Sequence, residues 1–257
     1  MTDLSDLFGL AGKTAFISGS SRGIGFAMAK ALASAGATVI INGRDEDHVQ
    51  KALGSLAESG IQAIGSTFDL TVAEDVEREI GRLEAERGPI DILVNNAGMQ
   101  HRAPFADFPL DMFDRLMRTN LYSAFYVTRP VVRSMMARKT GSITNICSVQ
   151  SELGRSSIVP YTASKGAMKM LTKGLATELG PHGIRVNGIG PGYFRTELNE
   201  ALVQDAEFSR WLVGRTPLAR WGEVDELGGA AIFLASDASS FMTGQIIYVD
   251  GGMTGSV

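Results

Sequence analysis

A tyrosine and a lysine stand four residues apart, at Tyr161 and Lys165. On a helix, this spacing places both side chains on one face. A free phenol has a pKa of about 10 and is a poor acid–base catalyst at neutral pH, but an adjacent cation favours the phenolate and lowers that pKa. The pair therefore indicates proton transfer by Tyr161, and an ordinary surface pair of tyrosine and lysine is the alternative.

Ser148 directly follows an apolar run, Ser142–Cys147, and its hydroxyl could hydrogen-bond a carbonyl or hydroxyl group of a substrate. Cys147 has no histidine near it in the sequence, so we interpret it as part of a strand core rather than as a nucleophile. We interpret His101, which nothing in the sequence orients, as a loop residue rather than a catalytic base.

Three glycines with the spacing G-x-x-x-G-x-G (Gly19, Gly23 and Gly25) follow the first apolar run, Lys13–Ser18. The spacing differs from the common G-x-G-x-x-G motif, but the physical logic is the same. Glycines let the backbone turn sharply and approach a pyrophosphate, which binds the free N–H groups of the following helix. The turn therefore indicates a dinucleotide cofactor, although glycines are also common at ordinary strand–helix turns.

The second apolar run, Thr38–Asn42, is followed by Gly43 and Arg44. NAD sites usually place an acidic residue here to bind the adenosine ribose hydroxyls, and this chain has none. Arg44, together with Arg22, could instead bind a ribose 2′-phosphate, so we expect NADP (NADPH) as the cofactor. The alternative is that Arg44 only connects the run to the next helix.

The elements that position these residues alternate between short apolar runs and amphipathic stretches. The stretches at residues 25–35, 45–59 and 72–87 have helical spacing, and the pattern predicts an α/β, single-domain, doubly wound Rossmann fold over residues 1–257. We expect a cofactor half at about 13–140, a catalytic and substrate half at about 141–257, and helices flanking a seven-stranded parallel sheet. Its strands would be the runs 13–18, 38–42, 62–67, 91–95, 142–147, 185–189 and 245–249.

Composition excludes several other classes. The chain has 257 residues with a net charge of −4, and therefore no basic excess for binding a nucleic acid. A single cysteine and three scattered histidines exclude a disulfide framework and favour no metal site. No apolar run is long enough to span a membrane, and residues 1–13 do not resemble a signal peptide, so we expect a cytoplasmic protein.

The order of these motifs resembles that of the short-chain dehydrogenase/reductase family. Ser18 stands where this family usually has threonine, which keeps the hydroxyl group. The resemblance covers the chain from the glycine turn to Asp250-Gly251-Gly252 and includes Asn95-Asn96-Ala97-Gly98, Asn120, Ser148, Tyr161-x3-Lys165 and Pro191-Gly192.

The resemblance implies a role for each catalytic position. Tyr161 would be the general acid in reduction, Ser148 would polarise the carbonyl, and Lys165 would hold the nicotinamide ribose and lower the pKa of Tyr161. Asn120, in the middle of a long helix, would help position a water that relays protons to Lys165. The implied cofactor residues are Gly19, Ser21, Arg22, Gly23, Ile24, Gly25, Arg44, Asp69, Leu70, Asn95, Ala97, Gly98, Tyr161, Lys165, Pro191, Gly192, Phe194 and Thr196. Family members usually form tetramers, so the resemblance also implies a homotetramer.

Polar segments flank the catalytic residues and indicate a polyhydroxylated acid as substrate. Arg102 is the best candidate for binding its carboxylate, with Ser148, Gln150 and Tyr161 as the other expected substrate-binding residues. A solvated loop is the alternative for Arg102. Within the family, the segments 40–45, 98–105, 145–155 and 188–199 resemble the gluconate 5-dehydrogenases. This resemblance implies NADP(H)-dependent reduction of 5-keto-D-gluconate to D-gluconate.

Three other functions remain open at this point. Related sugar-acid dehydrogenases share much of this pattern. A 3-oxoacyl-carrier-protein reductase of the same family would need a basic docking patch for its acidic carrier, and the net charge argues mildly against it. A sensor that binds NADP(H) without turnover would have no chemical need for Ser148, Tyr161 and Lys165 together.

Overall fold

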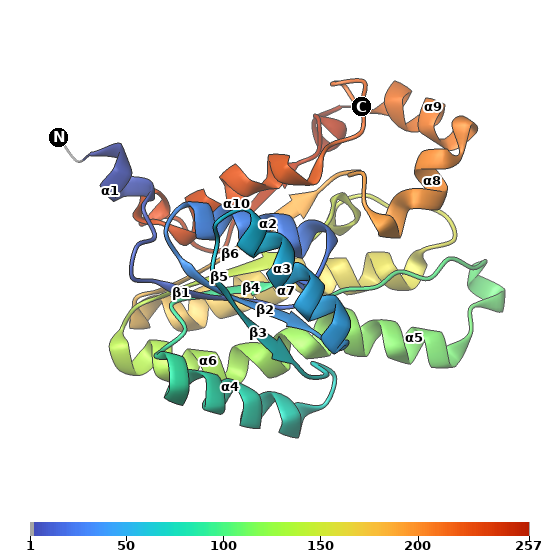
Figure 1. Ribbon diagram of the computed structural model, residues 1–257. Coiled ribbons are helices and arrows are strands. Elements are labelled where there is room, and N and C mark those ends of the chain that lie inside the picture. Colours follow the sequence, from blue (N-terminus) through green and yellow to red (C-terminus); the bar gives the residue numbers. More distant parts are fainter. Residues whose placement is uncertain (1–2, 257) are drawn as a thin grey trace.

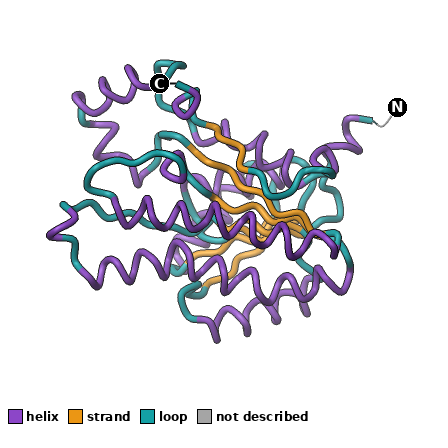
Figure 2. Tube along the Cα trace, turned by 180° about the vertical axis from the view of Figure 1, so that it is seen from behind, coloured by secondary structure: helices purple, strands orange, loops and turns teal. Residues whose placement is uncertain are grey.

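The computed structural model describes residues 3–256, with the side chain of Leu198 left out. Seven strands form one parallel sheet in the order β3-β2-β1-β4-β5-β6-β7, with helices on both faces (Figures 1 and 2). Each predicted run forms one strand, and no strand end differs from its predicted position by more than two residues. The strands are β1 Thr14–Ile17, β2 Thr38–Gly43, β3 Ala63–Thr67, β4 Ile92–Asn95, β5 Gly141–Ile146, β6 Ile184–Pro191 and β7 Ile246–Val249.

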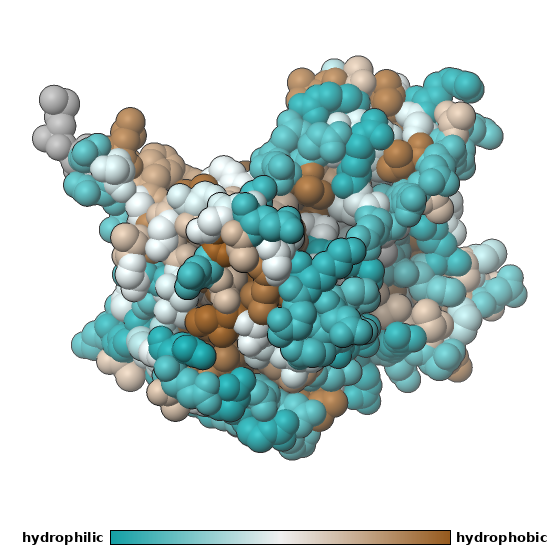
Figure 3. All heavy atoms as spheres, in the orientation of Figure 1, coloured by the Kyte–Doolittle hydropathy of each residue, from teal (hydrophilic) through white to brown (hydrophobic). Residues whose placement is uncertain are grey.

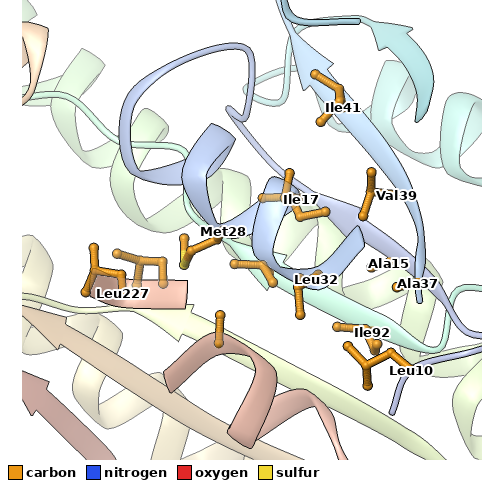
Figure 4. Close-up of a cluster of buried hydrophobic side chains, with 14 of the residues drawn as sticks. Leu10, Ala15, Ile17, Met28, Leu32, Ala37, Val39, Ile41, Ile92 and Leu227 are labelled. Carbon is orange, nitrogen blue, oxygen red and sulfur yellow. The ribbon is translucent and has the colours of Figure 1, made fainter. Parts of the chain in front are cut away.

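Residues along the central strands alternate between two hydrophobic cores because successive side chains of a strand point to opposite faces of the sheet. Ala15 and Ile17 pack on one face with α2 (Gly23–Ser34), α3 (Glu46–Glu58) and α10 (Gly228–Ala235). Figure 4 shows part of this core, with Met28 and Leu32 of α2 among Ile17, Ile92 and Leu227. The apolar segment 228–235 is therefore a buried helix.

Phe16, between those two residues, points to the opposite face of the sheet. There it packs in the core covered by α4 (Ala73–Arg87), α6 (Ser123–Arg138) and α7 (Val159–Leu179). Burial on both faces explains why the strands are short apolar runs rather than alternating polar and apolar ones. The predicted helices at 25–35, 45–59 and 72–87 are α2, α3 and α4.

A buried polar chain joins the strands that carry the site. Asn95 at the end of β4 donates from Nδ2 to Thr128 Oγ1 and to Asn145 Oδ1, each at 2.9 Å, and Asn145 Nδ2 donates to Thr172 Oγ1 at 2.9 Å. Each such bond contributes about 1 kcal/mol net, and an unpaired partner would cost more. These hydrogen bonds therefore fix α6 and α7 against the ends of β4 and β5.

Two short helices after β6, α8 (Glu200–Gln204) and α9 (Ala206–Arg215), form a hairpin that projects from the rest of the molecule (Figure 1). The remaining helices are α1 (Leu4–Phe8) and α5 (Leu110–Met117). Hydrophilic side chains cover most of α3 and α4 on the visible face (Figure 3). Over residues 3–256, no helix is long and apolar enough to cross a membrane. The cytoplasmic location stays a prediction.

Candidate active site

A cleft of about 850 Å³ lies at the carboxyl ends of the strands and contains most of the residues that the sequence singled out. The order of the sheet reverses between β1 and β4, and ligands of open α/β sheets bind at such a point. The cleft extends from the glycine turn past Tyr161 to Arg102 and Arg155.

The glycine turn at one end of the cleft is held by Asn96 and Ser18. Asn96 Nδ2 donates to Ser18 O at 3.0 Å and to Gly19 O at 2.9 Å. Ser18 Oγ accepts from the backbone N–H groups of Asn96 and Ala97 at 2.9 and 3.0 Å, which accounts for the hydroxyl at this position. A Cβ on Gly25 would lie 2.4 Å from Asn96 Nδ2, so the close approach requires glycine.

The conformation of the turn and the helix after it fit a dinucleotide pyrophosphate. Gly19 and Gly23 have φ of 59° and 58°, the left-handed region that glycine favours. α2 begins at Gly23, so its free N–H groups belong to the residues that line the cleft.

The charges at this end of the cleft fit an additional phosphate. Arg44 lines the cleft and is exposed, and no carboxylate pairs with it in the described part of the chain. Arg22 is instead engaged in an ion pair with Glu197, with 2.8 Å between Nη1 and Oε2. The Arg22–Glu197 pair was not apparent from the sequence because the two residues are far apart in the chain.

Tyr161 and Lys165 lie in the first turns of α7, next to the end of β5. Lys165 is 4% exposed, and its Nζ donates to Ile146 O at 2.7 Å and lies 5.8 Å from the centroid of the Tyr161 ring. Ser148 Oγ accepts from Gln150 N at 3.1 Å, which begins the short 3-10 turn Val149–Ser151. The end of β5 therefore brings Ser148 to the side of α7 that carries Tyr161.

The pKa of Tyr161 differs from the sequence-based expectation. Burial raises it to about 12, against a hydrogen bond from Ser148 and the charge of Arg102, which lower it. The Lys165 ammonium group is bound to Ile146 O and lies over the ring of Tyr161. Burial also lowers the pKa of Lys165 to about 8. Tyr161 is therefore a protonated acid at neutral pH.

Two predicted site residues do not line the cleft. Asn95 is buried, with its side chain in the polar chain between the strands, and the neighbouring Asn96 lines the cleft instead. Asn120 lies in a π-helical turn, Arg118–Tyr122, between α5 and α6 rather than in one regular helix. Its side chain is bound to the backbone N–H and C=O of Met99 and to Ser164 Oγ, so it supports the loop after β4.

All the other predicted site residues line the cleft. They are Gly19, Ser21, Arg22, Gly23, Ile24, Gly25, Arg44, Asp69, Leu70, Ala97, Gly98, Arg102, Ser148, Gln150, Tyr161, Lys165, Pro191, Gly192, Phe194 and Thr196.

Sequence reasoning missed Arg155 and Tyr193 among the residues of the cleft. Arg155 ends the polar segment 145–155, but no neighbouring residue in the sequence marked it as part of the site. Tyr193 follows Pro191-Gly192 directly, so its place next to a family motif was the available signal. Within residues 3–256, no cluster of three or more His, Cys, Asp or Glu side chains could hold a metal ion.

Comparison with known proteins agrees with this geometry. The chain matches, over residues 19–254, the family model described as enoyl-(acyl carrier protein) reductase. The gluconate 5-dehydrogenase of Gluconobacter oxydans is 51% identical over 252 residues, which cover 98% of each chain. The chain belongs to the short-chain dehydrogenase/reductase family.

Two further members of the short-chain dehydrogenase/reductase family are similar over almost their whole length. The 5-keto-D-gluconate 5-reductase of Escherichia coli K12 is 49% identical over 97% of this chain and 98% of its own. A crystal structure of a gluconate 5-dehydrogenase from Burkholderia cenocepacia, in complex with NADP and tartrate, has a TM-score of 0.96 and 52% identity and covers 99% of this chain and 100% of that chain.

Proposed function

We propose that this short-chain dehydrogenase/reductase catalyses the NADP(H)-dependent, reversible reduction of 5-keto-D-gluconate to D-gluconate. The observation that carries the proposal is the junction of Tyr161, Ser148 and Lys165 with the cation Arg102 in one cleft. The relatives that are about 50% identical in sequence over almost their whole length are named for the same substrate, which supports this proposal.

NADP(H) fits the end of the cleft formed by the glycine turn. The N-terminus of α2 would hold the pyrophosphate, Arg44 and Arg22 the 2′-phosphate, and Lys165 the nicotinamide ribose. When bound, the cofactor supplies or accepts the hydride, and the protein supplies position and protons.

Tyr161 donates the proton in the reduction. The proton passes from the phenol to the carbonyl oxygen at C5, which becomes the hydroxyl oxygen of D-gluconate, and returns in the reverse direction. Ser148, whose hydroxyl lowers the pKa of Tyr161 through hydrogen bonding, is placed to polarise the same carbonyl. Lys165, with its pKa of about 8, stabilises the phenolate that remains.

The substrate end of the cleft offers a cation for the carboxylate of a sugar acid and a hydrogen-bond acceptor for one of its hydroxyls. Arg102 donates to Gln100 Oε1 at 2.9 Å and has no carboxylate partner among the described residues, so a substrate carboxylate can bind it. Gln150 is buried, and its Oε1 has no hydrogen-bond donor from the described protein. A sugar hydroxyl would satisfy this acceptor.

The direct test follows NADPH oxidation with 5-keto-D-gluconate and, separately, with an acetoacetyl thioester. The acyl substrate is the second candidate because the matching family model carries the description of an acyl-carrier-protein reductase. We expect turnover of the sugar acid and little of the thioester. The opposite result would replace the sugar acid by an acyl carrier, and turnover of neither, with NADPH still bound, would favour a sensor.

We further propose a homotetramer. Phe125 on α6 is 54% exposed and Phe241, before β7, is fully exposed, so both offer apolar surface to another copy. Sedimentation at micromolar concentration would show the tetramer, and a monomer would contradict it.

A further inference from the structure

Two guanidinium groups stand at the substrate end of the cleft. Arg102 reaches it from the loop after β4, and Arg155 reaches it from the loop between β5 and α7. Neither has a carboxylate partner within residues 3–256, whereas eight other arginines of that range form ion pairs with Asp or Glu. Arg102 is close enough to Arg155 and to Tyr161 for the charges of both to act on it.

Arg155 is held in place by aromatic groups. Its Nη1 donates to the Tyr193 hydroxyl at 3.3 Å, and its guanidinium carbon lies 5.2 Å from the centre of the Phe208 ring. Phe208 belongs to α9, and its ring centre lies 5.7 Å from that of Tyr193 and 6.2 Å from that of Trp221. The contact with Phe208 orients the guanidinium and leaves its charge without an anion.

The two cations act on each other. Burial lowers the pKa of Arg102, and the positive charge of Arg155 lowers it further. Like charges in a partly buried cleft are unfavourable until an anion joins them. A carboxylate has two oxygens and can accept hydrogen bonds from two guanidinium groups at once.

We propose that the carboxylate of the sugar acid binds between Arg102 and Arg155, so that Arg155 is a second substrate-binding cation. This inference rests on the proposed function. Because Arg155 also contacts Phe208 and Tyr193, the hairpin of α8 and α9 becomes part of the substrate site. The buried acceptor Gln150 Oε1 would accept from a hydroxyl of the same molecule.

The test compares Arg155→Met with Arg210→Met. Arg210 is an exposed arginine of α9 and serves as the matched control. With 5-keto-D-gluconate and saturating NADPH, Arg155→Met should raise KM at least about tenfold, the effect of losing a charge-assisted hydrogen bond. The kcat should change much less, because the carboxylate contact is equally strong in the ground state and the transition state. Arg210→Met should leave both constants unchanged.

A second measurement uses the two tryptophans of the chain. Trp211 and Trp221 both pack with Tyr193 in the aromatic group around Phe208. Titration of the NADPH complex with D-gluconate, a pair that cannot react, should change tryptophan fluorescence in the wild type, with a Kd that rises at least about tenfold in Arg155→Met. Phe208→Leu keeps both arginines and should raise this Kd by a smaller factor. It replaces Arg155→Met in the test if that variant does not fold.

The outcomes separate the two proposals. A wild type that turns over no sugar acid overturns the proposed function and this inference with it. Wild-type turnover of 5-keto-D-gluconate with an unchanged KM in folded Arg155→Met overturns the inference alone. An unchanged Kd in Phe208→Leu, where Arg155→Met does not fold, also overturns it.

Discussion

Arg22 and Glu197 form an ion pair of 2.8 Å that joins the glycine turn to the segment after β6. Both residues line the cleft, and both side chains are about two thirds exposed. Glu197 therefore competes for the guanidinium group that would bind the 2′-phosphate of NADP(H). It also places a negative charge near that phosphate.

Replacing Glu197 should strengthen NADP(H) binding. Glu197→Gln removes the competing charge and leaves Arg22 to the phosphate, so Kd for NADPH should fall by about two- to fivefold, the range of an exposed ion pair of up to about 1 kcal/mol. The Kd for NADH, which has no 2′-phosphate, should stay constant. Calorimetric titration with both cofactors measures this, and an equal gain for NADH would show that Glu197 acts on the segment rather than through Arg22.

Arg44 should determine the preference for NADP(H). Arg44→Leu removes a cation that has no partner within the described protein, and kcat/KM for NADPH should fall about tenfold while that for NADH changes little. The single substitution is the cleaner test, because a Cβ on Gly43 would lie 2.9 Å from Val49 Cγ2 and disturb the site. Arg87→Leu, at the exposed end of α4, is the matched control. Equal losses with both cofactors would contradict this role.

Burial of Lys165 makes stability depend on pH in a specific direction. Its pKa falls from 10.5 in the unfolded chain to about 8 in the fold, so between these values the unfolded chain binds more protons and stability rises with pH. Relative to Lys165→Met, the free energy of unfolding of the wild type should therefore rise by about 3 kcal/mol between pH 7 and pH 10.5. Titration of Tyr161 largely cancels in this difference.

Urea unfolding of both proteins across this pH range gives the comparison. Below pH 8 the penalty for the buried charge is fully present in the wild type, and above pH 10.5 it is absent. A difference in unfolding free energy that does not vary with pH would mean that Lys165 keeps its ordinary pKa in the fold, as a well-solvated lysine does.

The fold was predictable because it depends on local patterns. Short apolar runs between glycines mark strands buried on both faces, and the alternation of Ala15, Phe16 and Ile17 between two cores follows from the geometry of a strand. The glycine turn and the Tyr161–Lys165 spacing were predictable for the same reason, since each lies within one short segment.

The parts that the sequence did not predict depend on contacts between distant segments. Glu197 reaches Arg22, and Phe208 reaches Arg155, only after the chain has folded. The bond from Lys165 Nζ to Ile146 O, and the burial that raises the pKa of Tyr161, likewise depend on how α7 packs beside β5. Asn120 was expected in a regular helix, and the π-helical turn that directs it to Met99 has no clear sequence signal.

The central claim is that Tyr161 donates the proton, and Tyr161→Phe tests it most directly. This substitution removes only the hydroxyl group and keeps the ring that lies against Lys165. For NADPH-dependent reduction of 5-keto-D-gluconate at pH 7, we expect kcat to fall on the order of a hundredfold or more, the scale of general acid catalysis, with Kd for NADPH nearly unchanged. A folded Tyr161→Phe protein with near-wild-type kcat would contradict the account.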